Sequence, residues 1–173
     1  AARRTAAAAR RTSRMSKHDE KATIALIIDD EPQIRRLLRV TLEANNYRVF
    51  DAATGHDGVV QAAQRRPDVV LLDLGLPDSQ GLGTFESAYA KFPNIPIIVL
   101  SGMTDEFLAL QAVQSGAQDY LVKGQAGWNL GPRAIRYAIE RHQSQLAMRA
   151  SEANARLDEV DAKQFVGAAL PHQ

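Results

Sequence analysis

Residues 68–81 read DVVLLDLGLPDSQG, a short apolar run that stops at the carboxylate of Asp73 and passes into turn-forming residues. A run of this length and composition is typical of a β-strand that is buried on both faces. Strands of that kind belong to parallel sheets covered by helices on both sides. This stretch therefore predicts an α/β fold.

The same pattern recurs three times along the chain. Apolar runs also end at Asp29 and Asp30, at Ser101 and at Lys123. In an open parallel α/β sheet, ligands bind outside the carboxyl ends of the strands. We therefore expect these side chains and Asp73 to lie together at one edge of the sheet.

Short apolar runs alternate with amphipathic stretches between Thr23 and about Arg141. The predicted strands cover residues 23–28, 47–51, 68–73, 96–101 and 118–122. The predicted helices cover residues 32–45, 55–65, 81–91 and 104–115. Five βα units in succession predict a doubly wound three-layer sandwich. The second strand mixes in charged residues and therefore suits an edge of the sheet.

A long helix is predicted after Gly131-Pro132, because residues 133–163 contain neither Gly nor Pro. One apolar stripe with a seven-residue period continues beyond Arg141, but its companion stripe is poor. A dimeric coiled coil and a single solvated helix both remain open. We expect residues 143–173 to form a helical extension with a disordered end.

Charge is distributed unevenly along the chain. Residues 1–18 carry six basic and no acidic side chains, which leaves 15 basic against 20 acidic side chains in the remainder. We expect residues 1–21 to be a disordered basic tail or upstream sequence from a misplaced start. A transit peptide and a basic binding arm are the alternatives. The acidic balance of the remainder argues against nucleic-acid binding by the folded part.

The composition also limits the chemistry and the compartment. The chain contains no cysteine, which excludes disulfides, thiol catalysis and cysteine-bound metals and fits a reducing compartment. No apolar run approaches the roughly 18 residues of a membrane-spanning helix. We expect a soluble, cytoplasmic protein.

Clustered carboxylates repel one another, so they need a cation or a raised pKa. Mg²⁺ prefers oxygen ligands and keeps several of its waters. The carboxylates of Asp29, Asp30 and Asp73, together with the backbone carbonyl of Gly75, therefore predict a Mg²⁺ site.

Two further side chains suit the transfer of a phosphoryl group to this site. The Ser101 hydroxyl and the Lys123 ammonium can each contact an incoming phosphoryl oxygen. With Asp73 as the nucleophile and a divalent cation beside it, the set is complete for phosphoryl transfer to an aspartate.

Four motifs carry a resemblance to the response-regulator receiver domain of two-component signalling. They are IIDDE at 27–31, LLDLGLPDSQG at 71–81, VLSG at 99–102 and GAQDYLVK at 116–123. The resemblance covers residues 22–142. It implies a flavodoxin-like sandwich around a five-stranded parallel sheet in the order 2-1-3-4-5.

The resemblance implies a phosphorelay function rather than an enzyme. A sensor histidine kinase or a phosphotransfer protein would donate a phosphoryl group to Asp73. Asp30 and Asp73 would bind Mg²⁺ directly, and Asp29 would help through water. The alternatives are a phosphate-independent adaptor that dimerises and a Mg²⁺-dependent aspartyl-phosphate phosphatase. The phosphatase mechanism requires a second acidic residue two positions after the nucleophile, where this chain has Gly75.

The resemblance also implies how the signal leaves the site. Ser101 and Lys123 would contact the phosphoryl group, and Tyr120 would rotate inward when Ser101 moves. The surface formed by about residues 104–145 would change and serve as the target or dimer face. A homodimer through that face or through the C-terminal helix is a further expectation, without membrane or nucleic-acid partners.

The chain departs from the family pattern near the site. Gly124 follows the lysine, where the family commonly has a proline. Gly75 and Met103 flank the expected phosphoryl position and offer no polar side chain that could hold an attacking water. We therefore predict slow autodephosphorylation, which a Met103→Glu substitution would accelerate.

Overall fold

The computed structural model describes three stretches of the chain, residues 22–102, 105–124 and 131–168, with side chains up to residue 160. The expectations for the tail 1–21, for Met103 and for residues 169–173 lie outside these stretches. The strands are β1 (Thr23–Ile28), β2 (Tyr47–Ala52), β3 (Val69–Asp73), β4 (Gly75–Leu76), β5 (Ser79–Gln80), β6 (Ile97–Ser101) and β7 (Asp119–Val122). The helices are α2 (Pro32–Glu43), α3 (Gly55–Arg65), α4 (Leu82–Lys91), α5 (Glu106–Gln114) and α6 (Gly131–Ala168).

Five of the strands form one parallel sheet in the order β2-β1-β3-β6-β7. This is the predicted 2-1-3-4-5 order, because β6 and β7 are the fourth and fifth strands of that sheet. The charged strand β2 lies at an edge, as expected. The short antiparallel hairpin of β4 and β5 was not predicted, since its residues are turn formers.

Both faces of the sheet are covered, which explains the uninterrupted apolar strands. Every residue of β3 and β6 is buried. Leu26 and Ile28 belong to a core shared with α3, α4 and α5. Their neighbours Ala25 and Ile27 belong to a second core shared with α2 and α6. Successive strand residues therefore face opposite layers of a three-layer sandwich, as predicted.

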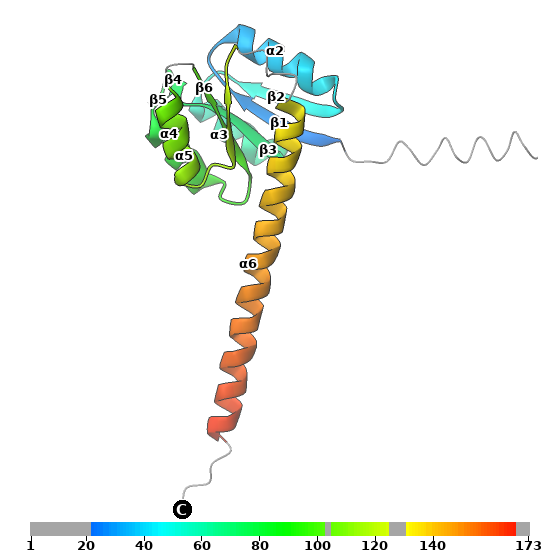
Figure 1. The fold of residues 1–173 in the computed structure, drawn as a ribbon, viewed down its shortest axis with the longest axis vertical. Helices are drawn as coiled ribbons and strands as arrows, with labels where there is room; N and C mark the ends of the chain where they lie inside the picture. Colours follow the sequence, from blue (N-terminus) through cyan, green and yellow to red (C-terminus); the bar gives the residue numbers. More distant parts are fainter. Residues whose placement is uncertain (1–21, 103–104, 125–130, 169–173) are drawn as a thin grey trace, which may run out of the picture.

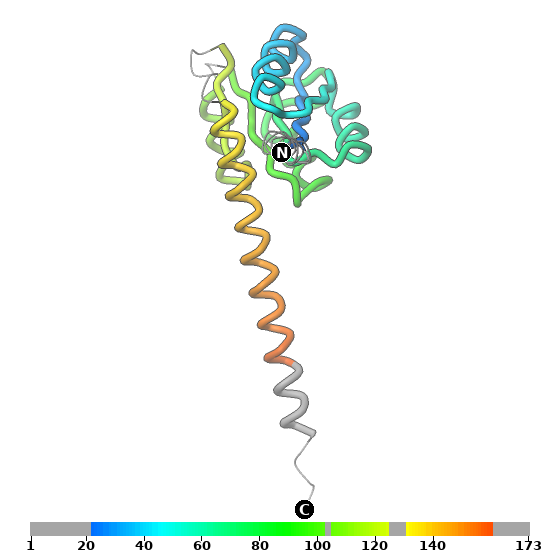
Figure 2. The backbone as a smooth tube through the Cα atoms, turned by 90° about the vertical axis from the view of Figure 1, so that its right-hand side faces the viewer, coloured from blue at the N-terminus to red at the C-terminus, as the bar shows by residue number. Residues whose placement is uncertain are grey.

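Helix α6 starts on the sheet and then leaves it (Figure 1). Ile135 and Ala138 are fully buried against the sheet. Beyond His142, every described side chain is exposed except the half-buried Leu146. A second view shows the same projecting helix (Figure 2). The predicted long helix is therefore confirmed. Within the described residues, no helix has both the length and the apolar character that crossing a membrane requires.

The point where α6 leaves the sandwich is held by Gln118, which precedes β7. Its side-chain nitrogen lies 3.1 Å from Nδ1 of His142 and donates to Oε1 of Gln145 at 3.0 Å. Its side-chain oxygen accepts a hydrogen bond from Nε of Arg141 at 3.0 Å. These contacts tie α6 to the outer strand of the sheet.

Helix α3 approaches β1 so closely that one position requires glycine. A Cβ atom added to Gly58 would lie 2.4 Å from Cδ1 of Ile28. Ile28 is buried and cannot withdraw into solvent. Gly83, in the first turn of α4, has no atom within 4 Å of the corresponding position.

We predict that Gly58→Ala destabilises the protein by about 1–2 kcal/mol. Alanine gains up to about 1 kcal/mol in helix propensity, but overpacking a core costs about 1–3 kcal/mol. Gly83→Ala gains propensity without a clash and should be neutral or stabilising. Urea unfolding followed by circular dichroism measures both variants. A Gly58→Ala protein as stable as the wild type would contradict the close approach of α3.

The loop between β4 and β5 is fastened to the start of α3 by Asp78. Its two carboxylate oxygens accept hydrogen bonds from the backbone N–H groups of Gly55 at 2.8 Å and His56 at 2.9 Å. These two bonds hold the pKa of Asp78 below its ordinary value. A carboxyl group whose pKa is lower in the folded state stabilises the folded protein at pH values above its unfolded-state pKa. This contribution to stability is lost as the pH falls through the folded-state pKa.

We predict that Asp78→Asn lowers the free energy of unfolding at pH 7, because the charged acceptor is lost. The difference in unfolding free energy from the wild type should narrow as the pH falls from the ordinary aspartate pKa of about 4 toward the lower pKa of folded Asp78, because the wild-type carboxylate becomes protonated over this range. Denaturant unfolding at a series of pH values measures this difference. The control is Asp158→Asn, an exposed position on α6. A difference in unfolding free energy that stays constant between pH 7 and pH 3 would contradict the role of the Asp78 carboxylate in holding this loop to α3.

Candidate functional site

Four acidic side chains meet where β1 and β3 end. The two strands are parallel neighbours with Ile28 beside Leu72, so the residues that follow, Asp29 and Asp73, arrive at the same edge. Carboxylate oxygens of Asp29, Asp30, Glu31 and Asp73 all lie within 4.8 Å of one another. Asp29 and Asp73 are buried, whereas Asp30 and Glu31 are exposed. The cluster thus has two buried carboxylates at its bottom and two solvent-accessible carboxylates at its rim.

Lys123, which directly follows the edge strand β7, brings a positive charge to this cluster. Its Nζ atom lies 2.8 Å from Asp29 Oδ2, 2.8 Å from Glu31 Oε1 and 2.9 Å from Asp73 Oδ2. Burial alone would lower the pKa of Lys123, but the three carboxylates outweigh it and raise the pKa above its ordinary value. The lysine therefore stays charged, although one ammonium does not balance four carboxylates.

The side chain of Asp29 is fully buried, and its environment favours an added cation. Burial raises the pKa of Asp29, although Lys123 and the backbone N–H of Glu31 act in the opposite direction. Its Oδ1 atom accepts the Glu31 N–H at 2.8 Å. Its Oδ2 atom has the ion pair with Lys123 but no well-oriented hydrogen bond among the described residues. A set of ligands made only of oxygen atoms, with lone pairs left for a further bond, suits a hard divalent cation such as Mg²⁺.

Ser101 and Gly75 border Asp73 from two directions. Ser101 ends β6 and is buried, and its hydroxyl has no hydrogen-bond partner within the described stretches. The N–H of Gly75 donates to Asp73 Oδ1 at 3.2 Å. A Cβ atom at Gly75 would lie 4.0 Å from both Asp73 oxygens, so no side chain screens the carboxylate there.

These residues open onto a cavity of about 450 Å³ at the carboxyl ends of the strands. Its lining includes predicted site residues: Asp30, Asp73, Gly75, Ser101 and Lys123. Asp29 is not in the lining and lies beneath it. Glu31, Gln80 and Asp105 also line the cavity and were missed. Of these three, only Glu31 carries a signal in the sequence, its place beside the aspartate pair.

Tyr120 lies apart from the cavity. Its hydroxyl donates to Oε1 of Glu106 on α5 at 3.2 Å, and this bond raises the pKa of Tyr120. The structure therefore joins Asp29, Asp30, Asp73, Ser101 and Lys123 in one place but puts the predicted switch residue against α5. Gly124, after the lysine, has a φ of 76°, which proline cannot adopt.

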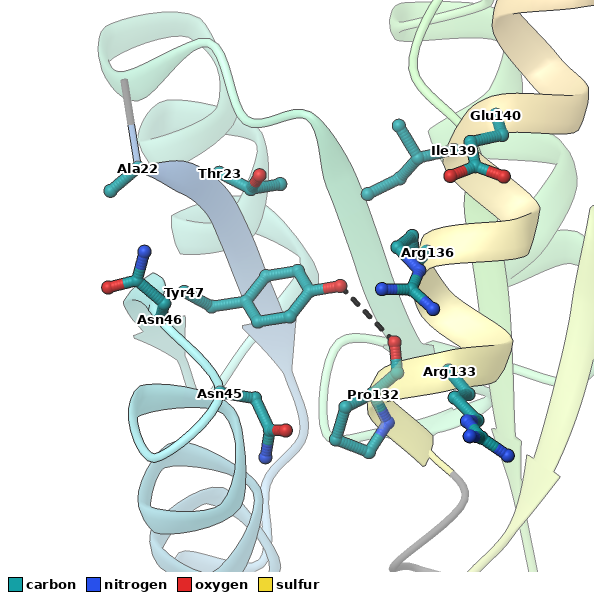
Figure 3. Close-up of a pocket in the computed structure, with 10 residues that line it drawn as sticks. All are labelled: Ala22, Thr23, Asn45, Asn46, Tyr47, Pro132, Arg133, Arg136, Ile139 and Glu140. Carbon is teal, nitrogen blue, oxygen red and sulfur yellow. Dashed lines mark hydrogen bonds between the residues drawn. The ribbon is translucent and has the colours of Figure 1, made fainter. Parts of the chain in front are cut away.

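A larger groove of about 740 Å³ lies at the opposite end of the strands (Figure 3). Thr23 and Tyr47, which begin β1 and β2, face the start of α6 across it. The Tyr47 hydroxyl crosses the groove to donate to the Pro132 carbonyl at 3.3 Å. Among the described residues that line it, Glu140 alone is a carboxylate, so this groove does not share the chemistry of the acidic cavity.

Comparisons with known sequences agree with the geometry of the acidic cavity. Residues 25–131 match the model of the response regulator receiver domain. The KDP operon transcriptional regulatory protein KdpE of Escherichia coli is 42% identical over 125 residues, which is 72% of this chain and 55% of that protein. KdpE of Mycobacterium tuberculosis is 46% identical over 101 residues, 58% of this chain and 44% of that protein. The chain thus spans about half the length of these relatives.

Comparisons with solved structures lead to the same family. A response regulator receiver domain protein from Clostridium thermocellum superposes with a TM-score of 0.63 at 28% identity, covering 71% of this chain and 98% of that one. The receiver domain of NtrX from Brucella abortus gives 0.61 at 28% identity, covering 67% and 98%. The strand order, the acidic cavity with its lysine and these matches agree, and the chain belongs to the response-regulator receiver domain family.

Proposed function

We propose that this protein is a phosphoacceptor in a two-component phosphorelay and that Asp73 carries the phosphoryl group. The observation that supports this most directly is the contact of Lys123 with both Asp73 and Asp29, beside the Ser101 hydroxyl, which has no hydrogen-bond partner among the described residues. The donor would be a sensor histidine kinase or a phosphotransfer protein, in keeping with the family. We place this chemistry in the cytoplasm, which the absence of cysteine supports.

In the proposed transfer, an Asp73 oxygen attacks the phosphorus of a phosphohistidine. The new O–P bond forms as the P–N bond breaks, and the departing imidazole takes up a proton. Asp29, Asp30, Asp73 and the Gly75 carbonyl would hold Mg²⁺. When bound, the cation neutralises the carboxylates and polarises the phosphoryl oxygens.

The phosphoryl group would then recruit two donors that already lie at the site. The Ser101 hydroxyl has no partner to give up within the described residues. Lys123 would exchange at least one of its three carboxylate contacts for a phosphoryl oxygen. Phosphorylation of Asp73 thus changes the contacts of Lys123, which follows the edge strand β7, and of Ser101, which ends the neighbouring strand β6.

We propose the surface of residues 104–145 as the part that responds. Phe107 and Leu110 on α5 and Tyr137 on α6 are large apolar side chains with exposed fractions of 71%, 46% and 58%. Movement of Tyr120 toward Ser101 would break its bond to Glu106 in the middle of this region. A target protein or a second copy of the chain would cover these apolar side chains.

Two other functions have less support. A phosphatase with an aspartyl nucleophile would need a second acid at Gly75. A phosphate-independent adaptor draws support from the exposed Leu157 and Val160 on α6, but it leaves the acidic cavity without a role. Direct nucleic-acid binding by the sandwich is not proposed, because its charge balance is acidic.

We predict that the wild type gains the mass of one phosphoryl group when incubated with acetyl phosphate and Mg²⁺. Asp73→Asn should gain none, because the amide is a poor nucleophile, and chelation of the cation should abolish the wild-type gain. Asp158→Asn is the control and should behave like the wild type. Intact-protein mass spectrometry reads the result. Modification that persists in Asp73→Asn would refute the assignment, and an unmodified wild type would favour the adaptor.

We predict that Gly75→Asn shortens the lifetime of the phosphoryl group several-fold. The space beside Asp73 holds no side chain, and an amide placed there can orient an attacking water. The measurement is the decay of phosphorylated protein after removal of acetyl phosphate. Gly83→Asn, outside the cavity, is the control. An unchanged lifetime in Gly75→Asn would mean that the empty space does not limit hydrolysis.

A further inference from the structure

Arg35, in the first turns of α2, holds the peptide that joins Asp29 to Asp30. Its Nη1 atom donates to the Asp29 carbonyl at 2.7 Å. Its Nε atom donates to Asp51 Oδ2 on strand β2 at 2.9 Å. The guanidinium thus bridges the edge strand of the sheet and the backbone of the acidic loop.

This bridge completes the anchoring of the Asp29 backbone. The N–H of Asp29 already donates to the Ala52 carbonyl at 3.1 Å, which extends the pairing of β1 with β2. With the carbonyl of Asp29 held by Arg35, both polar groups of its backbone are tied to strand β2. The orientation of the next peptide, and with it the position of Asp30, is therefore fixed.

Asp30 depends on this support because its own side chain has none. It is exposed and accepts no hydrogen bond from the described residues, whereas Asp29 and Asp73 are held by N–H groups and by Lys123. A ligand that is not held by its own contacts must be positioned by its backbone. Partners in the outer shell of a metal site typically change metal affinity by about 10–100-fold.

We propose that Arg35 is a positioning residue for the cation site and that Asp51 orients it. By bridging Asp51 and the Asp29 carbonyl, Arg35 fixes where Asp30 presents its carboxylate to a divalent cation. This inference rests on the proposed function. Arg35 would determine the affinity for the cation without touching it, and Arg35 is not among the predicted site residues.

Arg39 provides a matched control one turn further along α2. It also contacts Asp51, and its Nη1 atom also donates to a backbone carbonyl, that of Val49 at 2.9 Å. Val49 lies within β2 and away from the acidic loop. Arg39 therefore shares the Asp51 contact of Arg35 and lacks the contact with the Asp29 carbonyl that the proposal requires, and it also forms an ion pair with Glu43 on its own helix.

The test is a titration of the full chain with Mn²⁺, in which electron paramagnetic resonance measures the free ion. Arg35→Ala should weaken Mn²⁺ binding roughly 10-fold or more, and Arg39→Ala by less than about 3-fold. Arg35→Lys should resemble Arg35→Ala, because an ammonium keeps the charge but cannot bridge two acceptors as a guanidinium does. The double variant Arg35→Ala/Asp51→Asn should bind no more weakly than Arg35→Ala alone.

Two further measurements separate positioning from general damage. Urea unfolding should show similar losses of stability for Arg35→Ala and Arg39→Ala. Phosphorylation by acetyl phosphate in Arg35→Ala should need more Mg²⁺ but reach a near wild-type rate at saturation.

The proposal is overturned if Arg35→Ala binds Mn²⁺ as the wild type does, if Arg39→Ala weakens binding equally, or if Arg35→Lys restores it fully. In those cases the wild type still binds the cation, and the proposed function stands. A wild type that neither binds Mn²⁺ nor takes up a phosphoryl group would overturn the proposed function and this inference together.

Discussion

The structure around the site depends on one ion pair network, in which Lys123 meets Asp29, Glu31 and Asp73 at distances of 2.8 to 2.9 Å. Buried carboxylates repel one another, and burying their charges without partners is costly. Lys123 offsets part of that cost and is itself kept protonated by the same carboxylates. The remaining negative charge makes the cavity receptive to a divalent cation. The ion pairs also leave Lys123 ready to exchange a carboxylate for a phosphoryl oxygen.

The parallel sheet is what brings these groups together. Asp29, Asp73 and Lys123 come from three separate βα units, 44 or more residues apart in sequence. They meet because parallel neighbours end at the same edge, and because helices on both faces leave that edge as the accessible one. Tyr120, on β7, bonds to Glu106 on α5, and Gln118, just before β7, bonds to Gln145 on the projecting helix α6. These contacts tie β7, the strand that leads to Lys123, to the helices α5 and α6.

Most of the sandwich could be predicted because its signals are local. Each apolar run with a polar end became a strand, and β1 and α3 have the predicted bounds. The hairpin of β4 and β5 was missed because its pairing is made by turn residues, and no periodic pattern marks it. Gln80 and Asp105 were missed because the unpredicted β4–β5 hairpin carries Gln80 to the cavity and Asp105 only precedes α5, so neither ends a predicted strand. The bridge of Arg35 depends on Asp51, a contact between a helix and an edge strand that sequence spacing does not encode.

We propose that Asp73, Ser101 and Lys123 together receive a phosphoryl group beside a divalent cation. A crystal structure of the protein with Mg²⁺ and beryllofluoride, a mimic of the phosphoryl group, tests it most directly. We expect beryllofluoride to be bonded to an Asp73 oxygen and contacted by Ser101 Oγ and Lys123 Nζ, with Mg²⁺ held by Asp30 and Asp73. Beryllofluoride absent from Asp73, with Lys123 still bound to all three carboxylates, would contradict it.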